Sequence, residues 1–167
     1  MQILGFAKKK SKEEIVEEVI LEQYNQYYRL AYSYVRNEAD AEDIVQSGAY
    51  KALRGSKDLR SPENAGTWVY RIMLNEIFSF VRRPQPESYE YIQEELGMEP
   101  KYVEDNYVDI DLQRALDSLQ EQDKAIVIMK FFEDKKLEEI AEILNENLST
   151  VKSRLYRSMK KLRMILE

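Results

Sequence analysis

Two short amphipathic segments near the C-terminus constrain the fold of this chain more than any other feature. Apolar residues recur at helical spacing in the first segment, at Leu137, Ile140, Ala141 and Leu144. Asn145 then interrupts the pattern, and Asn tolerates the left-handed backbone with which many helices end. Asn147 can accept a hydrogen bond from the free amides that open the next helix. The sequence therefore predicts two helices joined by a tight turn.

The second of these helices has two chemically different faces. Its apolar side contains Val151, Leu155, Met159, Leu162 and Leu166. Its polar and basic side contains Lys152, Ser153, Tyr156, Arg157 and Lys160, and residues 147–166 include six Lys or Arg and no acid. Such a helix-turn-helix is typical of major-groove binding, where cations neutralise phosphates and Lys, Arg and Ser reach base edges. A core helix with a solvated cationic face is the alternative interpretation.

Length and composition indicate a soluble, helix-rich protein. A chain of 167 residues has room for one domain or two small ones, and 44% apolar with 34% charged residues is ordinary for such a protein. No stretch approaches the ~20 apolar residues that a membrane-spanning helix needs. No apolar run of signal-peptide type follows the basic N-terminal residues. We therefore expect a cytoplasmic protein.

The chain contains no Cys and no His. This excludes disulfides, thiolate zinc sites, nucleophiles that use Cys or His, and imidazole acid–base chemistry. None of the five Gly belongs to a GxGxxG or GxxxxGK phosphate-binding loop. We therefore expect no catalytic residues, no metal site and no cofactor, and the sequence does not indicate an enzyme.

The net charge of −6 is unusual for a DNA-binding protein, but the acidity is concentrated in one segment. Residues 1–83 sum to +1, residues 84–109 to −7 and residues 110–167 to 0. Two near-neutral blocks neutralise few phosphates, so the chain alone should hold DNA weakly. The charge pattern implies a partner that supplies the remaining affinity.

Apolar periodicity indicates a first helical block that ends before Pro84. It comprises a mobile basic lead at 1–12, helices near 13–36, 39–54 and 65–83, and a polar loop at 55–66. Several tyrosines share one stripe of the first helix, and we expect them in the core with hydrated hydroxyls rather than as a base-stacking platform.

The second helix of this block carries Asp40, Asp43 and Gln46 away from its apolar face. Taken alone, these residues are typical of solvated surface. A carboxylate pair for a metal ion is the weaker interpretation, because no further ligand converges on them.

The remainder of the chain is predicted to form a linker and a second helical block. Residues 84–109 hold three prolines and most of the net negative charge, which is typical of a flexible linker. Residues 110–167 predict four helices, the last two forming the helix-turn-helix. The sequence thus predicts an all-α fold of two small domains, an N-terminal three-helix domain at 13–83 and a C-terminal four-helix domain, joined by the linker.

Three motifs in this order resemble the extracytoplasmic-function group of bacterial sigma factors. They are DAEDIVQ at 40–46, TWVYRI at 67–72, and the helix-turn-helix with TVKSRLYR at 150–157. These look like the family's polymerase-binding helix, −10 promoter helix and −35 reading motif. The resemblance covers roughly 17–83 and 110–166, and implies sigma regions 2 and 4 in a protein that binds core RNA polymerase and opens promoters.

The resemblance also implies a role for individual residues. It places Asp40, Asp43 and Gln46 on core polymerase, and Lys57, Arg60, Arg71 and Asn75 on the −10 strand, with Asn75 at a base or the backbone. It places Lys152, Ser153, Arg154, Tyr156, Arg157 and Lys160 on −35 DNA, with Arg154 and Lys160 at phosphates. Trp68 is expected in the core. Members of the family are generally held inactive by an anti-sigma factor, often membrane-anchored, so such a partner is expected.

The sequence departs from the family pattern at several positions. Ser47 follows the glutamine of the second helix where an acid is usual, and Gly48 and Ala49 stand where bulkier residues are typical. Leu74 and Ser79 replace a usual basic residue and a usual Asp, and Asn145-Glu146 replace a usual Gly and apolar residue. The promoter sequence is therefore not transferable from the family.

Two other functions compete with the sigma factor. A stand-alone helix-turn-helix regulator would bind duplex DNA without polymerase, but it would not need the 40–46 and 67–83 segments. A helical adaptor without nucleic-acid function would tolerate charge reversal at Lys152 and Arg157.

Overall fold

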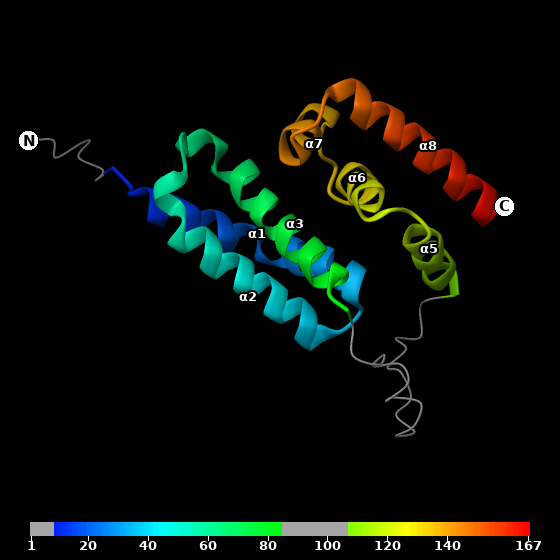
Figure 1. The fold of residues 1–167 in the computed structure, drawn as a ribbon, viewed down its shortest axis with the longest axis horizontal. Helices are drawn as coiled ribbons and strands as arrows, with labels where there is room; N and C mark the ends of the chain where they lie inside the picture. Colours follow the sequence, from blue (N-terminus) through cyan, green and yellow to red (C-terminus); the bar gives the residue numbers. More distant parts are fainter. Residues whose placement is uncertain (1–8, 85–106) are drawn as a thin grey trace, which may run out of the picture.

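The computed structural model of the chain describes residues 9–84 and 107–167. All regular secondary structure in these residues is helical, which confirms the predicted all-α class. Figure 1 shows two groups of helices. The first consists of α1 (Lys12–Val35), α2 (Glu38–Arg54) and α3 (Ala65–Arg82), and the second of α5 (Tyr107–Asp117), α6 (Glu121–Phe131), α7 (Leu137–Leu144) and α8 (Leu148–Leu166).

Some expectations fall on residues outside these ranges. Most of the basic lead predicted at 1–12, and most of the linker predicted at 84–109, lie outside the described residues. At the edges of those segments, Lys12 already belongs to α1 and α5 begins at Tyr107. No helix in the described part of the chain is long and apolar enough to cross a membrane.

Side-chain caps define where the first two helices begin. The Ser11 hydroxyl accepts a hydrogen bond from the Glu14 amide at 3.1 Å, and the Asn37 side chain accepts one from the Asp40 amide at 2.9 Å. Between the two helices Arg36 adopts a left-handed conformation with φ of 50°. The break predicted at Asn37 is therefore confirmed, and it turns α2 back along α1.

The apolar face predicted for α2 is buried in full. Its members are Ala41, Ile44, Val45, Gly48 and Ala52. Gly48 allows α2 and α3 to approach closely, since a Cβ atom at this position would lie 2.5 Å from Met73 Sδ. The Ser47 hydroxyl donates to Glu76 of α3 at 3.0 Å. The unusual small residues at 47 and 48 therefore fit the packing of α2 on α3.

The tyrosines on the predicted stripe of the first helix belong to the core, whereas Tyr32 of the same helix is exposed. Tyr27 is fully buried and meets Tyr70 edge-on, with ring centroids 5.8 Å apart. Tyr24 and Tyr34 pack against the same core and keep a polar tip, because the Tyr24 hydroxyl donates to Glu42 and the Tyr34 hydroxyl to the carbonyl of Glu121 at 2.6 Å. Burial and Glu42 together raise the pKa of Tyr24 to about 12.

The C-terminal group contains the predicted helix-turn-helix. Asn145 adopts the left-handed conformation, with φ of 53°, and the Glu146 amide donates to the Ala141 carbonyl at 3.0 Å, so α7 ends as expected. One prediction about the turn, the side-chain cap by Asn147, was wrong. Asn147 stands at the N-cap of α8, but its side chain makes no capping hydrogen bond. Leu166 also departs from the expected apolar face, since it is 48% exposed near the C-terminus.

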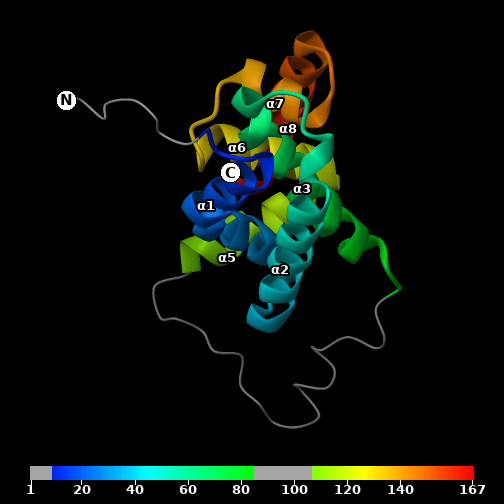
Figure 2. The ribbon, with the colours of Figure 1, turned by 90° about the vertical axis from the view of Figure 1, so that its left-hand side faces the viewer.

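Helix α3 packs on two sides, which joins the two groups of helices. Its buried residues include Val69, Met73 and Ile77 on one side and Tyr70, Leu74 and Phe78 on the next. Tyr70 and Phe78 still meet Tyr27 and Tyr34 of α1, and on its other side α3 packs against α7, which lies next to it in Figure 2. We call this packing of the N-terminal group against the C-terminal group the closed arrangement.

Candidate nucleic-acid interface

The outer face of α8 presents the predicted basic residues to solvent. Lys152, Ser153, Tyr156, Arg157 and Lys160 are all exposed, Tyr156 to 76%. Val151, Ser158 and Leu162 are buried on the opposite side and hold the helix on the domain. The helix can therefore offer cations, a hydroxyl and an aromatic ring to a groove without any change in its own packing.

Arg154 lies apart from this face. Its guanidinium is partly buried and donates to the side-chain oxygen of Gln122 on α6, and it lies 4.0 Å from Asp123. Both partners belong to the same helical group as α8. The structure therefore brings five of the six predicted −35 residues together and places the sixth on the inner side of the helix.

The predicted polymerase-binding residues form an acidic ridge on α2. Asp43 and Gln46 are exposed, and Asp40 is partly buried. Desolvation and, to a smaller extent, the nearby Asp43 raise the pKa of the Asp40 carboxyl. The Gln46 amide donates to Glu42 at 3.1 Å, and Glu42 also accepts the Tyr24 hydroxyl. The ridge thus concentrates negative charge on a helix that packs against α1 and α3.

The predicted −10 residues are divided between two places. Lys57 and Arg60 are exposed in the segment before α3, which contains two short 3-10 turns, Ser56–Asp58 and Pro62–Asn64. The carbonyl of Lys57 accepts a hydrogen bond from Lys12 at 3.4 Å, which ties this segment to the start of α1. Trp68 packs against the core, as expected.

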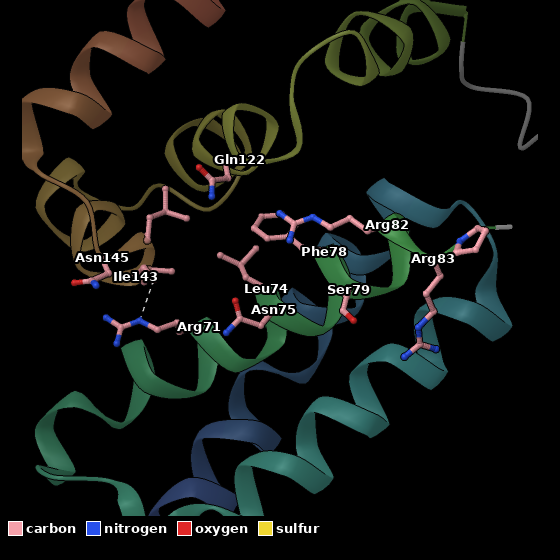
Figure 3. A pocket seen from close by; sticks show the side chains of 12 residues that line it. Arg71, Leu74, Asn75, Phe78, Ser79, Arg82, Arg83, Gln122, Ile143 and Asn145 are labelled. Carbon is pink, nitrogen blue, oxygen red and sulfur yellow. Dashed lines mark hydrogen bonds between the residues drawn. The ribbon is translucent and has the colours of Figure 1, made fainter.

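Arg71 and Asn75, one turn apart on α3, line a cleft between the two groups of helices (Figure 3). The cleft has a volume of about 800 Å³, with Leu74, Phe78 and Ile143 among its apolar walls. The Arg71 guanidinium donates to the carbonyl of Ile143 at 3.1 Å and to that of Glu142. These carbonyls end α7, where a cation complements the helix dipole.

Sequence reasoning missed the residues that join the two groups. Lys124, only 4% exposed, donates to the carbonyl of Ser33 at 2.6 Å and pairs with Asp117 at 2.7 Å. Burial lowers the pKa of Lys124, and Asp117 opposes that shift. A signal was present in the sequence, because the consecutive residues 125–129 are all apolar, and a helix that is apolar all round is packed on more than one side.

Family models match both halves of the chain. The model for Sigma-70 region 2 matches residues 19–86, and that for Sigma-70 region 4 matches residues 109–162. Over 159 residues the chain is 43% identical to RNA polymerase sigma factor SigV of Bacillus subtilis (strain 168), covering 95% of each protein. It is also 32% identical to ECF RNA polymerase sigma factor SigE of Mycolicibacterium smegmatis, over 88% of this chain and 60% of that protein.

The chain belongs to the extracytoplasmic-function group of RNA polymerase sigma factors. The α1–α3 group falls within the region 2 match except for the start of α1, and most of the α5–α8 group falls within the region 4 match. The fold of the sigma factor RpoE from Bartonella quintana, solved with the anti-sigma factor NepR, is similar, with a TM-score of 0.67 and 22% identity over 90% of this chain and 95% of that one. As a sigma factor, the protein acts in transcription initiation.

Proposed function

We propose that this sigma factor divides promoter recognition and polymerase binding among three separate surfaces. The outer face of α8 binds the −35 duplex, the 55–64 segment with α3 binds the −10 strand, and the acidic ridge of α2 binds core RNA polymerase. The observation that carries the proposal is the exposed basic face of α8 in a helix-turn-helix. Such a face neutralises phosphates and reaches base edges in the major groove.

On the −35 side we assign base and backbone contacts to Lys152, Ser153, Tyr156 and Arg157, and a phosphate contact to Lys160. Arg154 receives a different role from the one expected from sequence. Because its guanidinium is held by Gln122 of α6, we propose that it fixes α8 on the domain instead of touching a phosphate.

On the polymerase side, Asp40, Asp43 and Gln46 would meet a basic surface of the core enzyme. Two neighbouring carboxylates, one of them with its pKa raised by desolvation, gain from an opposite charge on a partner. On the −10 side we assign phosphate contacts to Lys57, Arg60 and Arg71, and a base or backbone contact to Asn75.

We also propose an anti-sigma factor as a partner. The support is the similar fold of the Bartonella protein, whose structure contains one. The sigma factor would act in the bacterial cytoplasm, without catalytic residues of its own, and a membrane-anchored anti-sigma factor would hold it at the membrane.

Pull-down of core RNA polymerase by the purified chain, followed by run-off transcription from a pool of genomic fragments, tests the proposal. We expect stable binding and new promoter-dependent transcripts. A chain that shifts duplex DNA but does not bind polymerase would instead be a stand-alone regulator. A chain that does neither would be an adaptor.

Charge reversal on the ridge tests the residue assignment in the same assay. Asp43→Arg should reduce polymerase binding about tenfold or more, since opposed charges become like charges. Glu22→Arg, which reverses an exposed acid on α1, is the matched control and should bind as the wild type does. Equal losses in the two variants would show that net charge, and not the ridge, determines binding.

A further inference from the structure

The contacts across the closed arrangement satisfy polar groups that are buried there. The Tyr70 hydroxyl of α3 donates to both carboxylate oxygens of Glu133, at 2.8 and 2.5 Å, from a side chain that is 2% exposed. Glu133 follows α6, in the other group of helices. A buried hydroxyl left without a partner is disfavoured, so this hydrogen bond favours one specific placement of the two groups.

A second contact joins the end of α1 to the start of α6. Lys124 donates to the Ser33 carbonyl, which lies in the last turn of α1, and the Lys124 ammonium lies 4.4 Å from the centroid of the Tyr34 ring. In return the Tyr34 hydroxyl donates to the Glu121 carbonyl. A buried ammonium at a helix C-terminus is stabilised by the helix dipole and by the aromatic face.

Charged residues reinforce both contacts at the rim. Arg82 of α3 pairs with Glu121, and Arg36 pairs with Asp117. A third contact between the groups is made at the surface by Arg71, whose guanidinium donates to the last carbonyls of α7. Arg71 is one of the residues assigned above to the −10 strand.

We propose that the two domains of the free sigma factor close on each other through the Tyr70–Glu133 and Lys124–Ser33 contacts, so that region 4 shields the −10 surface of α3 from DNA. The claim that region 4 shields α3 from DNA rests on the proposed function, whereas the claim that the two domains pack against each other does not. Closure leaves the acidic ridge of α2 and the basic face of α8 exposed. Polymerase and −35 DNA therefore engage first, and the −10 strand engages only after the domains separate.

Adjacent residues on two sides of α3 allow a direct test, because the chain has no natural cysteine. Leu74 lines the cleft and is 2% exposed, and Met73, 1% exposed, lies beneath α2. A thiol in Leu74→Cys reacts with a maleimide when the domains separate. A thiol in Met73→Cys reacts only when the N-terminal domain itself unfolds. The full chain carries one of these substitutions at a time.

In the closed protein we expect both thiols to react slowly. Adding Glu133→Ala, which removes the partner of the Tyr70 hydroxyl, should raise the labelling rate of Leu74→Cys about tenfold and leave that of Met73→Cys unchanged. Glu139→Ala, the loss of an exposed acid on α7, is the control and should change neither rate. Fast labelling of Leu74→Cys without Glu133→Ala, or an equal response of the two thiols to Glu133→Ala, would overturn the closing.

Core RNA polymerase provides the second arm of the test. Its addition should raise the labelling rate of Leu74→Cys, read on the sigma band alone, and should not raise that of Met73→Cys. An unchanged rate in a chain that binds polymerase would overturn the shielding of α3. Slow labelling of Leu74→Cys in a chain that does not bind polymerase would instead contradict the proposed function and leave the closing intact.

Discussion

The two helices that carry the proposed DNA contacts, α3 and α8, differ in what covers them. On α8 the outer face is open to solvent, and the cations of that face are exposed. On α3 the corresponding side is packed against α7, and its Arg71 guanidinium already bonds protein carbonyls. One chain therefore leaves its proposed −35 surface open to solvent, while its proposed −10 surface contacts its own second domain. Variants on the two helices should respond differently, and four predictions follow this contrast.

The largest effect is expected from truncating a side chain on the covered side of α3. Leu74→Ala should lower the free energy of unfolding of the full chain by about 2–5 kcal/mol, because a buried leucine is lost and a cavity is left. Tyr156→Ala removes an exposed side chain from α8 and should change it by no more than about 0.5 kcal/mol. Urea unfolding measures both. Similar small changes would show that α3 is not covered in solution.

A smaller effect is expected for DNA binding through the open face of α8. Arg157→Ala should weaken binding to the −35 duplex by about 1–3 kcal/mol if the guanidinium reads a base. Arg29→Ala removes an exposed arginine from α1, in the other group of helices, and serves as the control. Fluorescence anisotropy with the promoter found by run-off transcription measures both affinities. Equal affinity of Arg157→Ala for matched and mismatched duplexes, with no loss on the matched one, would remove Arg157 from the reading face.

The contrast also shows which parts of the structure the sequence could predict. The apolar face of α2 and the left-handed turn at Asn145 follow from local periodicity and backbone preference, and both are confirmed. The burial of Tyr70, Leu74 and Phe78 could not be predicted in the same way. Tyr70 and Phe78 meet Tyr27 and Tyr34 of α1, but the rest of their cover comes from a second domain far along the chain. The periodicity of one helix does not show what covers its second side.

The same reasoning applies to the candidate site. The basic face of α8 was visible in the sequence because one helix carries all of its members. Arg154 was assigned to −35 DNA by the resemblance to the family, and its contact with Gln122 depends on how α6 packs beneath α8. Glu133 and Lys124 were missed because each binds a group more than sixty residues away in the chain. Pairings of this kind need the tertiary structure.

The salt dependence of duplex binding gives a prediction of lower magnitude. Lys160→Gln should weaken binding to all duplexes alike and reduce the slope of log affinity against log salt by about 1, since one phosphate contact is lost. Lys10→Gln, on the N-terminal domain, is the control, because Lys10 pairs with Glu18 far from α8. A sequence-dependent loss in Lys160→Gln would assign Lys160 to a base and not to a phosphate.

The smallest effect concerns the carboxyl group beneath the covered side of α3. Burial raises the pKa of Glu133 above its ordinary value of 4.5, and the hydrogen bond from Tyr70 and the charge of Lys135 only partly oppose that shift. A carboxyl whose pKa is raised on folding adds stability below the ordinary pKa, and this stability is lost as the pH rises through the raised value. At neutral pH the ionised Glu133 therefore disfavours the closed arrangement relative to a neutral side chain that still accepts the Tyr70 hydroxyl.

Glu133→Gln makes this effect measurable, because the amide is neutral at every pH and its oxygen still accepts the Tyr70 hydroxyl. The variant should match the wild type in acid and become slightly more stable than it toward neutral pH, in contrast to the opening expected for Glu133→Ala. The difference between the two unfolding free energies, followed with pH, isolates Glu133 from the other carboxyl groups, which are present in both proteins. A variant that loses stability toward neutral pH would mean that the charge on Glu133 strengthens its bond to Tyr70 by more than its burial costs, and that the contact between the domains is an ionic one.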